Sequence, residues 1–135
     1  MTADTQPQGT VTFAFGDSPE MADELLGLVL AGKKTATCGA LRDFGPGGEA
    51  RPVVGRRDVI LDGKGRPAAL IETLEVTERG FDEIDEAFAR DEGEGTRTLE
   101  EWRAGHRAYF ERNGGWSADM MLLCERFRLV EDLTQ

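Results

Sequence analysis

The stretch that decides the fold class lies at residues 53–77 and reads VVGRRDVILDGKGRPAALIETLEVT. Its two halves, Val53 to Leu61 and Ala68 to Thr77, are rich in β-branched and other apolar residues, which favour strands. Between them stands Asp62-Gly63-Lys64-Gly65, a turn sequence of the kind that joins antiparallel strands. The stretch therefore predicts a β-hairpin in the middle of the chain.

On the N-terminal side of this hairpin, the sequence predicts a strand, a helix and a loop. The β-branched and aromatic residues at 10–15 are typical of a strand. Residues 17–32 predict a helix, because a capping residue and Pro19 open it and Gly32 is placed to end it. Residues 39–52 are rich in Gly and Pro and predict a loop.

On the C-terminal side, the sequence predicts two helices and a last strand. Residues 81–89 carry apolar side chains at helical spacing, and Thr98-Leu99-Glu100-Glu101 is the capping box of a further helix. Residues 120–130 form an apolar run that favours a long strand. The resulting order, β-α-β-β-α-α-β, favours an α+β fold.

The composition is that of one ordinary globular domain. The 135 residues predict a flexible tail at 1–10 and a single domain at 11–135. No apolar run reaches the ~20 residues of a membrane span, and no secretory signal is expected. Two cysteines and one histidine predict neither a disulfide framework nor a histidine-rich zinc site. We therefore expect a cytoplasmic protein with no membrane contact, no metal and no cofactor.

The charge of the chain is negative but uneven. A net charge of −10 argues against a protein that holds duplex nucleic acid by phosphate contacts alone. Residues 33–66, however, carry eight basic and four acidic groups, a local charge of +4. These groups form either a basic face on an acidic body or ordinary solvated surface charges, and the sequence leaves both interpretations open.

The first candidate site is the segment Gly32-Lys33-Lys34-Thr35-Ala36-Thr37. Lys34 and Thr37 stand three residues apart in a loop that begins with glycine, so the two side chains can reach one point. A lysine acts as a base when burial lowers its pKa, and a threonine hydroxyl needs such a base to become a nucleophile. The alternative is that these lysines only complement the dipole of the preceding helix.

The other candidates are carboxylates. Glu92 and Glu94 lie in a Gly-rich segment beside Asp91, which suits general acid/base chemistry but also suits a solvated connector. Glu125 falls on the apolar face of the last strand by period-2 alternation. A carboxylate among apolar neighbours needs a partner, and we expect an arginine or lysine in the interior of the fold to pair with Glu125.

An aromatic stripe runs along the expected helix that follows Thr98. Trp102, Tyr109 and Phe110 recur at helical spacing, which favours a core face over a platform for base stacking. His106 lies on the same stripe, and we interpret it as a packed core histidine and not as a catalytic base.

Several segments together resemble the ASCH-domain family, whose members have a fold similar to the PUA RNA-binding domain. They are Phe15-Gly16-Asp17-Ser18-Pro19-Glu20, Ala31 to Thr37, Phe88 to Gly95, Leu99 to Arg103 and Cys124 to Phe127. The resemblance implies an α+β fold, a small and mostly antiparallel PUA-like β-barrel with helices packed around it.

The motif Gly-x-Lys-x-x-Thr-x-Arg of that family is matched in part. Gly32, Lys34 and Thr37 match it, but Gly39 stands at the arginine position and Arg42 is the nearest arginine. By this resemblance we expect the substrate to be bound by four residues: Gly32, Arg42, Glu94 and Glu125.

The activities known among ASCH relatives are divided. Some relatives hydrolyse the amide of N4-acylated cytidines with a lysine, a threonine and a glutamate, whereas others are ribonucleases. The resemblance assigns these roles to Lys34 as base, Thr37 as nucleophile and Glu92 as acid/base, with Glu94 as the alternative glutamate.

We expect an amidohydrolase acting on a cytosine nucleoside, because an acidic protein suits a small neutral substrate better than a long polyanion. The alternatives are a ribonuclease acting on single-stranded RNA and a non-catalytic RNA-binding module. The oligomeric state is left open.

Overall fold

The structure is a computed structural model that describes residues 11–95 and 98–135, so the expected tail at 1–10 lies outside the described residues. Its strands are β1 (Val11–Phe13), β2 (Ala36–Ala40), β3 (Arg57–Leu61), β4 (Pro67–Gly80) and β5 (Met121–Asp132). Its α-helices are α1 (Pro19–Leu30), α2 (Glu86–Glu92) and α3 (Leu99–Arg112), with 3-10 turns at Leu41–Asp43 and Phe81–Glu83.

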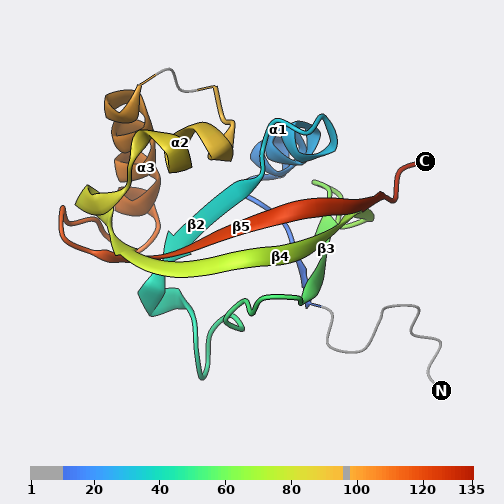
Figure 1. Ribbon diagram of the computed structural model, residues 1–135, viewed down its shortest axis with the longest axis horizontal. Coiled ribbons are helices and arrows are strands. Elements are labelled where there is room, and N and C mark those ends of the chain that lie inside the picture. The colour runs from blue at the N-terminus through green and yellow to red at the C-terminus, as the bar shows by residue number, and fades with distance from the viewer. Residues whose placement is uncertain (1–10, 96–97) are drawn as a thin grey trace.

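The five strands form one sheet in the order β1-β3-β4-β5-β2 (Figure 1). All neighbouring strands are antiparallel except β1 and β3, which are parallel. The pairing of β3 with β4 confirms the hairpin predicted from residues 53–77. The α+β class and the mostly antiparallel sheet are therefore confirmed.

The sheet curls into a half-barrel because its long central strand bends. β4 pairs with β5 over most of its length, and the register shifts between Leu70 and Ile71 and again between Thr73 and Glu75. Such irregularities increase local twist and bend a strand. The curl brings round the two edge strands of the described sheet, β1 and β2, and leaves the half-barrel open between them.

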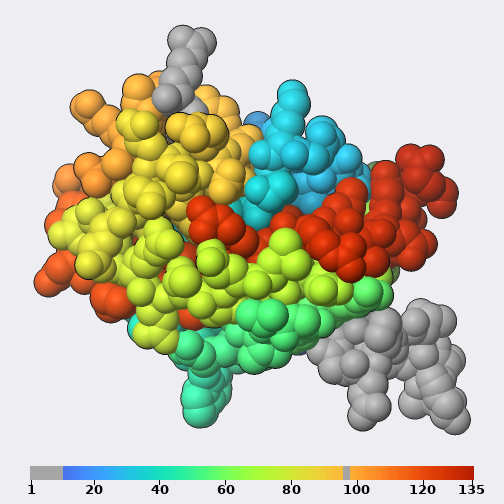
Figure 2. Space-filling model, viewed as in Figure 1, coloured from blue at the N-terminus to red at the C-terminus, as the bar shows by residue number. Residues whose placement is uncertain are grey.

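Two hydrophobic cores lie on either side of the sheet. Helix α1 packs the side chains of Leu25, Leu26 and Val29 against Ile60 and Ile71. Helices α2 and α3 cover the other core with Phe88, Trp102 and Phe110, which pack on Ala36, Ala40, Leu122 and Cys124. In the space-filling view, the pair α2 and α3 lies beside α1, and β5 runs below α1 (Figure 2).

The predicted helix starts are also observed. The hydroxyl of Ser18 accepts a hydrogen bond from the backbone N–H of Met21 at the start of α1. Thr98 and Glu101 form the reciprocal capping box at the start of α3. These local signals are reliable because they act within one turn of the helix.

Two local predictions were wrong in a way that matters for the site. Residues 36–40 form strand β2 and not the loop expected from residue 39, because their backbone pairs with β5 over five residues. Glu92 is the last residue of α2 and not part of a connector, since the helix begins at the Asp85 cap and ends at Gly93. Strand β2 is therefore decided by pairing with a distant segment, whereas α2 is bounded by its own capping residues.

Candidate active site

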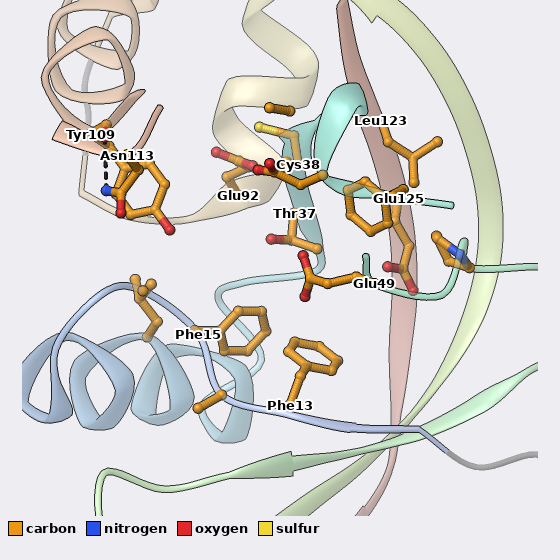
Figure 3. A pocket seen from close by; sticks show the side chains of 18 of the residues that line it. Phe13, Phe15, Thr37, Cys38, Glu49, Glu92, Tyr109, Asn113, Leu123 and Glu125 are labelled. Carbon is orange, nitrogen blue, oxygen red and sulfur yellow. Dashed lines mark hydrogen bonds between the residues drawn. The ribbon is translucent and has the colours of Figure 1, made fainter. Parts of the chain in front are cut away.

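The open side of the half-barrel forms a cleft of about 900 Å³. Strands β1 and β2 line it from opposite sides, and α3 contributes residues from its middle and its C-terminal end. Phe13 and Phe15 stand across the cleft from Thr37, Cys38 and Glu92 (Figure 3). Its aromatic lining consists of Phe13, Phe15, Phe44, Tyr109 and Phe110.

Strand β2 supplies side chains to the cleft from both of its faces. Thr37 is paired with Glu125 of β5, and the next residue, Cys38, is paired with Cys124. Because side chains alternate along a strand, Thr37 and Cys38 point to opposite faces of the sheet. β2 is an edge strand, however, so both residues reach the cleft.

Lys34 is buried directly behind this strand. Its side chain is fully shielded, and Nζ donates to Glu94 Oε2 at 2.6 Å and to the carbonyl oxygen of Ala36 at 2.8 Å. Nζ also lies 5.3 Å from the centre of the Phe15 ring. The lysine of the motif therefore forms an ion pair with a cleft carboxylate and touches the peptide group that precedes Thr37.

Gly32 places Lys34 without lining the cleft. Its φ of +77° ends α1, and the N–H groups of Lys33 and Lys34 both donate to the carbonyl oxygen of Leu28, at 2.9 and 3.1 Å. This turn directs the Lys34 side chain inward while Lys33 stays exposed. Gly32 thus shapes the motif, and its expected contact with substrate stays a prediction.

The backbone around Gly93 packs against the backbone of the lysine motif. Gly93 has a φ of +64°, and a Cβ atom added to it would lie 1.9 Å from the carbonyl oxygen of Lys33. The N–H of Thr35 donates to the carbonyl oxygen of Asp91 at 2.7 Å. These contacts fix the end of α2, and with it Glu92 and Glu94, beside Lys34.

Glu92 is a buried carboxylate surrounded by donors. Only 1% of the residue is exposed, and Oε1 accepts a hydrogen bond from Trp102 Nε1 at 2.7 Å and lies 2.8 Å from His106 Nε2. Burial by itself raises the pKa of Glu92, but the charge of Lys34 and the hydrogen bond from His106 outweigh it, so the pKa lies below its ordinary value. Glu92 is therefore ionised at neutral pH.

His106 belongs to the site, contrary to its interpretation as a core histidine. It lines the cleft beside Glu92, and its ring stacks on Trp102 with the centroids 4.0 Å apart. Burial lowers the pKa of His106, but the hydrogen bond and charge of Glu92 dominate and raise it above the ordinary value. The aromatic stripe located the correct face of α3. Helical spacing along α3 could not reveal Glu92, the partner of His106 on α2.

Glu125 also lines the cleft, but its partner differs from the expected one. Its Oε2 accepts a hydrogen bond of 2.6 Å from the hydroxyl of Thr73, whereas an arginine or lysine was expected. Arg56, the cation near it, forms a two-bond ion pair with Asp58 at 2.7 and 2.8 Å. Burial accordingly raises the pKa of Glu125, and the Thr73 hydrogen bond offsets only part of this effect.

Arg42 does not take the place of the motif arginine. It is exposed, it does not line the cleft, and its guanidinium donates to the carbonyl oxygen of Gly115 at 2.7 Å. At the motif position itself, a Cβ on Gly39 would lie 3.1 Å from the ring of Phe44. The aromatic ring therefore packs closely over the backbone at this corner.

The basic segment at 33–66 does not form a free basic face. Five of its eight basic residues form ion pairs with carboxylates: Lys34, Arg51, Arg56, Arg57 and Arg66. Within the cleft, Arg56 is paired with Asp58 and Arg112 with Asp17. Phosphate groups would have to compete with these carboxylates.

Comparison with known proteins identifies the family. The ASCH domain model matches residues 11–131. The chain belongs to the ASCH-domain family. It is similar to the solved structure of EF3133 from Enterococcus faecalis V583, with 36% identity and a TM-score of 0.81, over 89% of this chain and 76% of that one.

Two further solved ASCH structures are also similar to this chain. The ASCH domain of Lactobacillus crispatus JV V101 shares 30% identity at a TM-score of 0.81, over 90% of this chain and 80% of that one. The ASCH protein of Zymomonas mobilis shares 12% identity at a TM-score of 0.55, over 88% and 65%, which reflects the fold alone. A search of the curated proteins finds no match. No helix in the described part of the chain is long and apolar enough to cross a membrane.

Proposed function

We propose that this ASCH protein hydrolyses the amide of an N4-acylated cytosine nucleoside in the cleft. The observation that carries the proposal is the placement of Thr37 and Glu92 on the cleft wall with Lys34 buried against the peptide before Thr37. These three residue types perform this reaction in the relatives that the motif resembles. The cleft volume of about 900 Å³ falls in the ~300–1,000 Å³ range of small-molecule sites.

The charge of the cleft supports a neutral substrate. Of the side chains that line it in the described chain, six are carboxylic acids: Asp43, Glu49, Asp58, Glu92, Glu94 and Glu125. Its two arginines are held in ion pairs. Binding to a polyanion depends on basic groups that are free to replace counterions. A nucleoside that carries no phosphate avoids this requirement.

The acylation step of this proposal uses Lys34, Glu94 and Thr37. Lys34 Nζ lies 2.6 Å from Glu94 Oε2, so one ammonium proton can pass to this carboxylate. The neutral amine then takes the proton of Thr37 Oγ1 as this oxygen attacks the acyl carbonyl carbon. Alternate N–H groups of the edge strand β2 point away from β5, and they are available to stabilise the oxyanion.

The breakdown steps use Glu92 and His106. Since Glu92 is ionised in the free protein, its first proton comes from the His106 imidazolium 2.8 Å away. Glu92 gives this proton to the cytosine N4 as the C–N bond breaks. It then takes a proton from the water that attacks the acyl-Thr37 ester, and Lys34 returns a proton to the Thr37 oxygen as the acid leaves.

A direct assay separates this activity from the RNA alternatives. Purified protein is incubated with N4-acetylcytidine and, separately, with end-labelled single-stranded RNA, at low and at moderate salt. We expect release of cytidine at a rate that changes little with salt. Cleavage of RNA with a steep salt dependence, or binding of RNA without cleavage, in place of cytidine release would contradict the proposal.

Two lysine variants test the role of the motif. Lys34→Met is expected to abolish cytidine release, whereas Lys33→Met at the exposed neighbour is expected to retain it. Lys34→Met also lowers the melting temperature, because the lysine is buried and its loss leaves Glu94 without its ion-pair partner. Circular dichroism therefore has to show that the variant is folded at the assay temperature. Equal activities of the two variants would show that Lys34 is not the base.

A further inference from the structure

Three side chains of different chemistry meet at one point on the cleft wall. The Cys38 sulfur, a Glu92 carboxylate oxygen and a His106 ring nitrogen all lie within 4.8 Å of one another. In Figure 3 the Cys38 sulfur lies beside the Glu92 carboxyl group. They come from β2, the last turn of α2 and the middle of α3, so no spacing in the sequence connects them.

These side chains match the ligand preferences of one metal ion. Thiolate, carboxylate and imidazole are the groups by which proteins bind Zn²⁺, and three such ligands with a fourth open position are a common arrangement. We propose that Cys38, Glu92 and His106 form a zinc-binding site, and that zinc bound there inhibits the hydrolysis proposed above.

The His106 ring is already oriented as a ligand. Its Nδ1 lies 3.0 Å from the carbonyl oxygen of Trp102, which can only accept a hydrogen bond, so Nδ1 carries the proton of that bond. Nε2 consequently faces Glu92 and the cleft. Metal-binding histidines usually donate their second N–H to a carbonyl or carboxylate in this way. Stacking on Trp102, with the ring planes 18° apart, holds the ring in this orientation.

The Glu92 carboxylate is likewise held by an outer partner. Trp102 Nε1 donates to its Oε1 at 2.7 Å, so one tryptophan orients two of the three ligands. The neighbouring Lys34 ammonium opposes a cation at this point, and its ion pair with Glu94 at 2.6 Å offsets part of its charge. Two of the three ligands, Glu92 and His106, are therefore held by contacts that do not themselves depend on a metal.

The charges of the ligands suit a dication in this partly buried position. Zinc binding releases the thiol proton of Cys38 and the Nε2 proton of His106 to solvent. The Cys38 thiolate and the Glu92 carboxylate then carry two negative charges, and the neutral His106 adds none. The complex with Zn²⁺ is then neutral, which avoids the large cost of burying a net charge. All three residues line the cleft, so the ion and a water molecule in the open position have access from solvent.

Inhibition, unlike binding, rests on the proposed function. A Glu92 oxygen and His106 nitrogen that coordinate zinc are no longer free to transfer the proton to the leaving N4. Zinc and catalysis thus compete for the same two side chains. We expect EDTA to leave the rate of cytidine release unchanged or to raise it, and added zinc to lower it.

The site is tested on the full-length, EDTA-treated and reduced protein. Zn²⁺ is titrated by calorimetry, and Co²⁺ is used as a spectroscopic probe whose thiolate charge-transfer band reports a bound cysteine. One equivalent of zinc and a thiolate band are expected. Cys38→Ser should lose the band and weaken zinc binding by more than about 100-fold, since even an outer partner of a ligand is worth about 10–100-fold.

Cys124→Ser is the matched control. Cys124 is directly opposite Cys38 in the β2–β5 register but is outside the ligand cluster, so the band and the zinc affinity should persist. Melting curves without metal verify that both variants are folded. A wild-type protein that binds no zinc, or a thiolate band that survives in Cys38→Ser, would overturn the site.

The N4-acetylcytidine assay keeps the two proposals apart. Zinc is expected to inhibit the wild-type protein, and to inhibit Cys38→Ser far less relative to the activity of that variant without zinc. If zinc binds through Cys38 but the protein releases no cytidine under any condition, the metal site stands and the proposed activity fails. If cytidine is released and zinc does not bind, the reverse holds.

Discussion

Glu92 and Glu125 are both buried carboxylates that line the same cleft, yet their environments differ. Burial acts against the charge of each, as their exposures of 1% and 7% indicate. Glu92 has His106 and Trp102 as hydrogen-bond partners and the charge of Lys34 nearby, and its pKa is lowered. Glu125 has one hydroxyl partner, Thr73, and its pKa is raised. Neighbouring donors and cations, and not burial alone, therefore decide the direction in which the pKa of each carboxylate shifts.

The difference follows from the two faces of strand β2. Glu92 meets Cys38 on the face covered by α2 and α3, where a lysine, a histidine and a tryptophan converge. Glu125 is paired with Thr37 and lies on the other face. The cleft therefore places a charged carboxylate for proton transfer on one side of the edge strand. On the other side it places a carboxyl group suited to hydrogen bonding.

The largest expected effect is that of Glu92→Gln on turnover. A general acid/base contributes about 10²–10⁴-fold, so kcat for N4-acetylcytidine should fall by a factor in this range. Glu125→Gln is the matched control, because it removes a buried carboxylate from the same cleft, and it should change kcat only a few-fold. A larger loss in Glu125→Gln than in Glu92→Gln would exchange the roles of the two carboxylates.

Glu92→Gln is also expected to destabilise the protein, because Glu92 is buried. The same substitution at a carboxylate on an exposed loop would cost little stability. The amide removes the ion pair with His106 and the negative charge near Lys34, and it presents fewer acceptor sites to Trp102. The melting temperature is therefore measured together with kcat, so that loss of fold and loss of proton transfer are separated.

Gly93→Ala tests whether the Glu92 side of the cleft depends on close backbone packing. Its new Cβ would lie 1.9 Å from the Lys33 carbonyl oxygen at a φ of +64°, so the end of α2 has to move. We expect a loss in the free energy of unfolding above about 4 kcal/mol, measured by denaturant titration. Gly95→Ala has a φ of +85° but open space, and should cost only about 1–2 kcal/mol. Similar losses in both variants would show that only the φ angle matters.

The sequence predicted those parts of the fold whose signals are local. The β3–β4 hairpin, the start of α1 and the Thr98 capping box were all confirmed at their expected places. The resemblance to the ASCH family assigned Lys34 and Glu94 to one site, and the structure shows an ion pair between these two residues, which lie 60 positions apart. The catalytic roles assigned by that resemblance stay predictions.

The remaining features depend on contacts that no local pattern encodes. The strand at residues 36–40 has the sequence ATCGA, which has few β-branched residues, and it forms by pairing with β5. His106 looked like a core residue because its carboxylate partner is on another helix. Cys38 gave no signal, since its neighbours Glu92 and His106 are far along the chain. Tertiary pairing therefore decided each case.

His106→Asn tests the ionised side of the comparison through its pH dependence. The folded-state pKa of His106 is raised, so the pair with Glu92 stabilises the protein below the unfolded value of about 6.5 and is lost as pH rises through the folded-state pKa. The folded-state pKa of Glu92 is lowered, so Glu92 stays charged in the folded protein at pH values somewhat below its unfolded-state pKa of about 4.5. The variant should therefore be less stable by about 1.5–3 kcal/mol between about pH 4.5 and 6.5.

This difference in stability should shrink at alkaline pH, where His106 is neutral in both states of the wild-type protein, to the part that comes from packing on Trp102. Thermal melts of both proteins across this range measure it. The kcat of the wild-type protein should also fall as pH rises through the His106 pKa, because the first proton for N4 comes from this residue. A stability difference that does not vary with pH would show that His106 contributes by packing alone.

Glu125→Gln has the smallest expected effect, and its sign is opposite to that of Glu92→Gln. Because burial raises the pKa of Glu125, the folded state binds the proton more tightly than the unfolded state. Stability is then lost as pH rises from the unfolded value of about 4.5 through the folded-state pKa.

A glutamine at position 125 can still accept the hydrogen bond from Thr73 and carries no charge, so the variant avoids this loss. The variant should therefore melt at a higher temperature than the wild-type protein at pH 8 and at a similar temperature at pH 4. Melts of both glutamine variants at these two pH values compare the carboxylates directly. If Glu125→Gln is destabilised at pH 8 as Glu92→Gln is, then Glu125 is ionised and paired in the folded protein, and the contrast between the two sides of the cleft is lost.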